Sequence, residues 1–263
     1  MWVAQLRYPG AWIEGMSRDD AFRAQSLLST AEDALADAAL SLTFFEACRA
    51  TPHGPKRWEQ RRAREQELRA RVSAKYESQL GDVPESERWI ALLPMREAIE
   101  SEAKMLVWQE GDLPESYEGR LPFLHPRGFL FALDTLANLL RVMAKEAWAP
   151  APLRTIKDDW MIAFPELKHV RDTAHHVEDR VRGLDRDGKP LQLGPLVNEM
   201  INAPNGGVLL IDSLMNNRYG CTLADGTYGE VEISGISLAA AIAIVQRAIE
   251  AFQWRGPERF VPH

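Results

Sequence analysis

The sequence predicts a mostly α-helical protein of the α+β class, in which a helical bundle precedes a three-stranded antiparallel meander and a closing helix. Apolar residues recur at steps of three and four in the run that follows Ser17 and again from Leu167 to Leu184, which is the period of amphipathic helices. Beyond that point, short apolar runs flank the turn signals Asn216-Asn217 and Asp225-Gly226. These two patterns together indicate helices first and a small sheet afterwards.

The composition is that of an ordinary folded protein, with 46% hydrophobic and 26% charged residues in 263. This length allows one large domain or two small ones. The formal net charge of −7 disfavours binding to nucleic acid through overall charge, so any such contact needs a local basic patch.

We expect a cytoplasmic protein without a membrane partner. The first residues lack a basic segment followed by an apolar one, and no apolar run approaches the roughly 20 residues that span a bilayer. Cys48 and Cys221 lie far apart and form no C-x-x-C motif, so we expect both to be reduced thiols.

Residues 1–120 are predicted to form an N-terminal helical region packed on the bundle. Ser17 followed by two acids is typical of a helix start, and the alanine-rich run after it has high helix propensity as far as about Cys48. Residues 51–55 then break the chain. A further helical region spans Trp89 to Trp108, with Pro94 as its candidate break.

A strongly basic helix is expected at about 56–80. Between Lys56 and Lys75, eight basic residues face three acids, which gives a local charge of +5. Such a helix is usually a solvated face crossed by ion pairs. The alternative is a patch that binds RNA or another polyanion.

Residues 121–185 are predicted to form the bundle core. The helix from Phe129 to Trp148 is apolar on nearly every side and should be the most buried one. Asp134 within it is either a buried carboxylate that needs Arg127 or Arg171 as a partner, or an acid at the edge of the bundle. A helix follows to about Ala163.

Residues 186–263 carry the predicted meander and closing helix, although all three segments can also form one domain. The expected strands are 207–212, 218–223 and 228–234. Ser237 is the expected cap of a final helix that ends near Phe252.

The most informative segment is Arg171-Asp172-Thr173-Ala174-His175-His176, within a helix expected from Pro165 to Gly183. The apolar positions of that helix form one narrow stripe: Leu167, Val170, Ala174, Val177, Val181 and Leu184. His175 lies one turn after Arg171 on one flank of the stripe, and His176 lies one turn after Asp172 on the other. Neither histidine is therefore a core residue, and the remaining structural interpretation is a solvated charged face.

An arginine, a polar residue and then a histidine late in a helical bundle resemble the motif of HEPN domains. Here the arginine is Arg171, the polar residue Asp172 and the histidine His176. The wider segments 129–134, 167–172, 217–222 and 225–232 also resemble a group of poorly characterised bacterial HEPN-like proteins. The HEPN resemblance covers about residues 120 to 185.

The resemblance implies metal-independent cleavage of RNA by a homodimer, without a cofactor. His176 would act as general base on a ribose 2′-OH or as acid on the leaving oxygen, and Arg171 would bind the scissile phosphate. Asp172 would orient the imidazole of His176, and His175 is a rival for the same catalytic role. Such a nuclease would belong to a toxin or defence system, with an inhibitor protein as a further partner.

Two other hypotheses compete with the nuclease. His169, Asp172 and His176 share a helix face at i, i+3 and i+7, but ligands seven residues apart are roughly 10 Å apart, which is long for one zinc or manganese ion. The other hypothesis is a non-catalytic homodimeric interaction or regulatory module, in which Arg171 pairs with Glu178 or Asp134. For the nuclease, we expect Arg171→Ala and His176→Ala to abolish cleavage and to leave thermal stability nearly unchanged.

Overall fold

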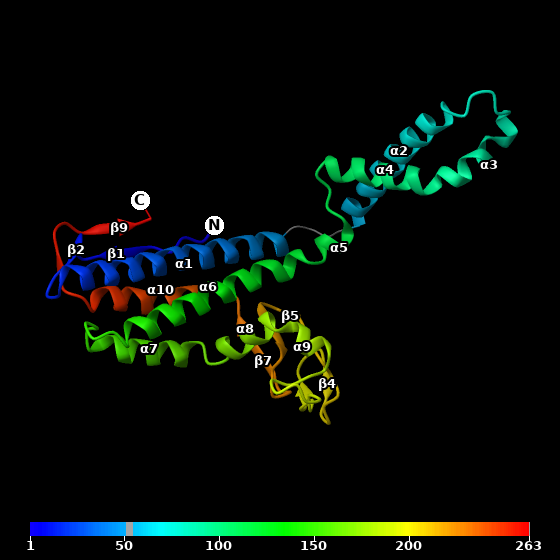
Figure 1. Ribbon diagram of the computed structural model, residues 1–263. Coiled ribbons are helices and arrows are strands. Elements are labelled where there is room, and N and C mark those ends of the chain that lie inside the picture. Colours follow the sequence, from blue (N-terminus) through cyan, green and yellow to red (C-terminus); the bar gives the residue numbers. More distant parts are fainter. Residues whose placement is uncertain (51–54, 263) are drawn as a thin grey trace. The chain divides into compact units, whose positions relative to one another are not determined.

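The computed structural model describes residues 1–50 and 55–262, and Figure 1 shows the order of its elements. The predicted class is confirmed: most elements are helices, and a three-stranded antiparallel sheet is followed by a helix. The chain divides into two compact units, unit 1 with Met1–Cys48 and Pro122–His263, and unit 2 with Arg49–Leu121. Within unit 1, the first long helix and the last one share a single buried core.

Four long helices build unit 1: α1 (Arg18–Ala50), α6 (Leu121–Met143), α7 (Pro152–Ala163) and α10 (Gly235–Glu250). Their apolar faces meet in a single buried cluster. Ser17 caps α1 as expected, since its Oγ accepts the Asp20 N–H at 3.1 Å. Ser234 rather than Ser237 caps α10, because it is Ser234 that has extended backbone and accepts the Ser237 N–H at 3.2 Å.

Helix α6 is buried on one side only, which corrects the expectation of a helix buried all round. Leu133 and Leu136 are fully buried, whereas Phe131 is 37% exposed and Val142 is 38% exposed. The helix also begins earlier than expected, at Leu121, and contains Pro126. Its open side faces the segment that carries the predicted site.

The sheet of unit 1 consists of β5 (Ser213–Met215), β6 (Arg218–Thr222) and β7 (Tyr228–Glu232) in sequential antiparallel order. Asn216 adopts a φ of 56°, and Met215 pairs directly with Arg218. The predicted turn at Asn216-Asn217 is therefore confirmed. The first strand, however, lies at 213–215 and not at 207–212, since the tight turn allows pairing only next to it.

Arg127 joins the sheet to α6. Its Nη2 donates to both carboxylate oxygens of Asp212, at 2.7 and 2.6 Å, and its Nε donates to the Tyr219 hydroxyl at 3.1 Å. Burial, with Asp212 adding to it, raises the pKa of Tyr219. Arg127 is therefore engaged by Asp212 and is not the partner of Asp134.

Three short strand pairs complete unit 1. They are β1 (Leu6–Tyr8) with β9 (Arg259–Val261), β2 (Trp12–Ile13) with β8 (Trp254–Arg255), and β3 (Leu196–Val197) with β4 (Asn202–Ala203). The first two pairs bring the N-terminal and C-terminal segments together.

Unit 2 is made of α2 (Pro55–Glu77), α3 (Arg88–Leu92), α4 (Arg96–Gln109) and α5 (Glu115–Glu118), with 3₁₀ turns at Glu85–Glu87 and Leu93–Met95. The turn at Leu93–Met95 confirms Pro94 as the break in the region from Trp89 to Trp108. Among the described residues of both units, no helix is long and apolar enough to cross a membrane.

Candidate functional site

The segment predicted to carry the site is two helices, α8 (Leu167–His175) and α9 (Val177–Val181), rather than one helix to Gly183. The break is at His176, whose φ of −104° and ψ of 47° leave the helical region. The apolar stripe of the second half meets no core, because Val181 is 66% exposed while Arg180 is buried instead. Since a helix depends on packing of its apolar face, the expected helix does not continue straight.

Arg171 is held by two carboxylates of its own chain. Its Nη2 contacts Asp134 Oδ2 and its Nη1 contacts Asp172 Oδ1, both at 2.8 Å. The Asp134 side chain is 14% exposed and that of Asp172 is 44% exposed. Of the two partners expected for Asp134, the structure therefore selects Arg171.

The carboxylate of Asp172 is paired with Arg171, and the hydrogen bond between Asp172 and His176 is a backbone one, from the His176 N–H to the Asp172 carbonyl oxygen at 3.0 Å. The Nδ1 atom of His176 instead lies 3.4 Å from Glu178 Oε1, and both of these side chains are more than 60% exposed. The resemblance implies that Asp172 orients the His176 ring. Among the described contacts, however, none joins the Asp172 carboxylate to that ring.

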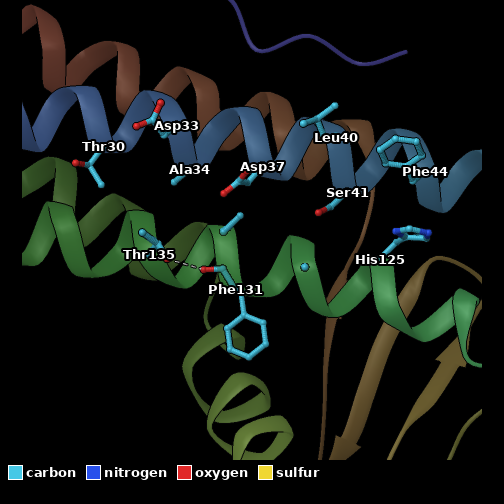
Figure 2. A pocket seen from close by; sticks show the side chains of 12 residues that line it. Thr30, Asp33, Ala34, Asp37, Leu40, Ser41, Phe44, His125, Phe131 and Thr135 are labelled. Carbon is cyan, nitrogen blue, oxygen red and sulfur yellow. Dashed lines mark hydrogen bonds between the residues drawn. The ribbon is translucent and has the colours of Figure 1, made fainter.

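His175 lies on the same helix face as Arg171 and packs on the open side of α6. The ring centroids of His175 and Phe131 are 4.6 Å apart, in an edge-to-face arrangement. Figure 2 shows the Phe131 side chain pointing away from α1. The centroids of His175 and His176 are 6.5 Å apart, and both residues are exposed. The structure therefore brings Arg171 and His175 together against α6 and leaves His176 at the helix break.

A pocket of about 1000 Å³ lies beside Arg171, lined by residues of α6, α7 and α8 and of the chain just after α6. Its acidic residues are Asp134 and Asp158, and its apolar ones include Trp160 and Met161. Six basic residues line it: Arg141, Lys145, Arg154, Lys157, Lys168 and Arg171. We call this the basic pocket. His175, one turn beyond Arg171 on α8, is not among its lining residues.

The sequence interpretation missed five of these six cations. The signal was present, because the basic residues come in pairs at spacings of four, three and three: Arg141 and Lys145, Arg154 and Lys157, Lys168 and Arg171. Residues at those spacings share a helix face. The sequence does not show how α7 packs against its neighbours, so it did not indicate that these three pairs border one pocket.

A second pocket, of about 450 Å³, lies between α1 and α6 (Figure 2). Asp33 and Asp37 line its middle, and His125 stacks on Phe44 at one end. Burial lowers the pKa of His125. None of the four predicted site residues lines this pocket.

The basic helix of unit 2 is largely neutralised by neighbouring acids. Four of its basic residues pair with acids outside the helix: Arg61 with Glu118, Arg64 with Glu110, Arg69 with Glu100 and Lys75 with Glu102. Lys56 and Arg57, which are part of the predicted basic run, lie outside the residues whose side chains are described. Of the two interpretations offered for this helix, these contacts favour an ion-paired face.

A metal site has no geometric support in the described part of the chain, where no three histidine, cysteine, aspartate or glutamate side chains are grouped as metal ligands would be. No family model, curated protein or solved structure matches the chain. Its function must therefore be argued from the geometry of these side chains.

Proposed function

We propose that this protein is a metal-independent ribonuclease of the HEPN-like type, with His175 and His176 as its proton-transfer groups. The observation that carries the proposal is the pair of exposed imidazoles whose centroids are 6.5 Å apart. An acid and a base must each reach, within about 3 Å, an oxygen on opposite sides of one phosphorus. Two imidazoles at this separation can flank a single phosphodiester.

In the proposed reaction, one imidazole removes the proton of a ribose 2′-OH as its oxygen attacks phosphorus. The bond from phosphorus to the 5′ oxygen breaks, and the other imidazole, in its protonated form, donates a proton to that oxygen. The products are a 2′,3′-cyclic phosphate and a free 5′-OH. All atoms and protons balance without a metal or a cofactor.

Arg171 can bind the phosphate only if it exchanges a carboxylate. Asp172 is the more exposed of its two partners, so we propose that the phosphate displaces Asp172 from Nη1 while Asp134 continues to hold Nη2. Asp172 would then act as a competitor of the substrate. On this basis Asp172→Asn should retain or increase cleavage, whereas Arg171→Lys should lose most of it.

The direct test is to incubate the purified chain with total RNA in EDTA and to assay the ends of the fragments. Cleavage that yields 2′,3′-cyclic phosphates and is lost in His175→Ala or His176→Ala supports the proposal. Wild-type protein that cleaves no RNA, at protein concentrations where it is folded, overturns it. Sedimentation of the chain tests whether the nuclease is a homodimer, and co-purification tests for the inhibitor protein of a toxin or defence system.

One observation favours a second candidate, a non-catalytic homodimeric interaction module. Arg171 is already neutralised by Asp134 and Asp172, as a structural arginine would be. For this candidate, neither the wild type nor Asp172→Asn would cleave RNA, whereas the loss of stability in Arg171→Ala is expected for both candidates. Cleavage of RNA by the Asp172→Asn variant therefore separates the two functions.

A further inference from the structure

We propose that the basic pocket binds a small ligand that carries several phosphate groups. This inference goes beyond the proposed ribonuclease and does not rest on it, since His175 and His176 do not line the pocket. At about 1000 Å³, the pocket is at the upper end of the volumes, roughly 300–1,000 Å³, that hold small molecules. A mononucleotide is of this size class.

The charges of the pocket are unbalanced. Asp134 pairs with Arg171 and Asp158 pairs with Lys157, so both acids of the lining are used. Arg141 donates to the Asn138 amide oxygen at 3.0 Å, which leaves its charge uncompensated. In the described part of the chain, no ion pair involves Lys145, Arg154 or Lys168. Four positive charges thus line one pocket in a chain with a net charge of −7.

These four cations come from separate parts of the lining. Arg141 lies on α6, Lys145 follows that helix, Arg154 lies on α7 and Lys168 on α8. A ligand with one carboxylate would engage only part of this set, whereas two or three phosphates can engage all of it. Arginine suits phosphate because its planar guanidinium donates two parallel hydrogen bonds.

The apolar part of the lining indicates that the ligand also has an organic portion. Trp160 is buried, Met161 is 50% exposed, and Ala137 and Ala144 complete this surface. An aromatic base or a similar flat group can pack there while its phosphates reach the four cations. The ligand class is therefore a phosphorylated compound of nucleotide type rather than inorganic phosphate alone.

Like charges in the pocket repel one another, so a polyanion that binds only the folded chain should stabilise that chain. The probes are adenosine triphosphate, inorganic triphosphate, adenosine, and a 12-nucleotide RNA without terminal phosphates. Calorimetric titration and thermal melting are carried out on the full chain, at low and at high salt. We expect adenosine triphosphate to bind most tightly, triphosphate more weakly and adenosine not at all, with binding weakened by salt.

Charge variants locate the site. Lys168→Ala and Arg154→Ala should each weaken binding of adenosine triphosphate at least about tenfold, which corresponds to roughly 1.4 kcal/mol. Arg71→Ala, an exposed arginine on α2, is the matched control and should leave binding unchanged. Lys168→Arg should restore most of the affinity. Equal losses in the pocket variants and in Arg71→Ala, or no binding of either triphosphate, would overturn the proposal.

Two further arms separate this site from the proposed nuclease. The His175→Ala/His176→Ala double variant should bind adenosine triphosphate as the wild type does, even where RNA cleavage is lost. If the RNA oligonucleotide binds through the pocket cations and adenosine triphosphate does not displace it, the pocket is an RNA site and the small-ligand proposal is wrong.

Discussion

Unit 1 buries a continuous apolar cluster contributed by residues from Leu6 to Val261, whereas α2 and α4 of unit 2 bury a small cluster around Val72, Ile99 and Ala103. The helices of unit 2 are instead joined by ion pairs at the surface. Because exposed ion pairs contribute little net stability and apolar burial contributes most of it, the two units should differ in stability and in sensitivity to salt.

The two units also differ in how their basic residues are paired with carboxylates. In unit 2 the cations form the denser run in the sequence, yet four of the six whose side chains are described pair with a carboxylate on α4, directly after α4 or on α5. In unit 1 the cations are spread over 31 positions from Arg141 to Arg171, yet four of them line one pocket without ion pairs. The position of the carboxylates, and not the local density of basic residues, decides which group can bind an anion.

The largest expected effect concerns the order of unfolding. In hydrogen exchange, amides of α2 and α4 should exchange at least about tenfold faster than those of α1, α6 and α10, because unit 2 buries little apolar surface. Raising the salt to 1 M should widen this gap by screening the ion pairs. Equal protection in both units, unchanged by salt, would contradict the contrast drawn between them.

The next effect compares two arginines. Arg171→Ala leaves the carboxylate of Asp134 without its ion-pair partner and should lower the free energy of unfolding by about 3 kcal/mol. This replaces the expectation from sequence that stability would hardly change. Arg69→Ala, which removes an exposed pair with Glu100, should cost at most about 1 kcal/mol. Urea titrations that rank the two variants in the opposite order would show that Arg171 is dispensable to the fold.

The two cysteines of unit 1 differ in burial and should therefore differ in chemical reactivity. Cys221 is fully buried, and burial raises its pKa to about 12, whereas Cys48 is partly exposed, although burial also raises the pKa of its thiol. At pH 8, iodoacetamide should therefore modify Cys48 and leave Cys221 intact, since only the thiolate reacts. Mass spectrometry after mild denaturation that unfolds unit 2 should still find Cys221 protected. Early modification of Cys221 would place it outside the stable core.

The smallest effect is a pH dependence confined to unit 1. Burial lowers the pKa of His125 in the folded chain, so the unfolded chain takes up a proton first as pH falls. Stability should therefore decrease below about pH 6.5, the pKa of a free imidazole. Urea midpoints at pH 7.5 and 5.5, compared between wild type and His125→Asn, isolate the contribution of His125 to the pH dependence of stability. A slope that is identical in the two proteins would assign the pH dependence to other groups.

Local patterns were enough to predict the fold class and several boundaries. Ser17 as a cap, Pro94 as a break and Asn216-Asn217 as a turn act through their immediate neighbours, so their effects can be read along the chain. The burial of α6 on one side and the end of α8 at His175 depend on which surfaces meet in space. Periodicity alone does not supply that information.

The candidate site was predictable only in part. The residue types of Arg171, His175 and His176 indicated phosphate chemistry, but Arg171 could be named only as one of two alternative partners of Asp134, because the pair joins residues 37 positions apart. The four unpaired pocket cations were missed because each is an ordinary basic residue of its own helix or, for Lys145, of the turn that follows α6. They form one site only because α6, α7 and α8 lie together around the pocket, which no local sequence pattern predicts.

The stacked rings of Phe44 and His125 show where unit 2 is inserted into the chain of unit 1. Their ring centroids are 5.7 Å apart, so the end of α1 and the start of α6 meet within unit 1. Unit 2 is therefore an insertion between two neighbouring points, and a short linker from Cys48 to Pro122 can replace it with little change in closure entropy. Such a trimmed chain would retain the basic pocket, His175 and His176, and would reveal what the inserted helices add to them.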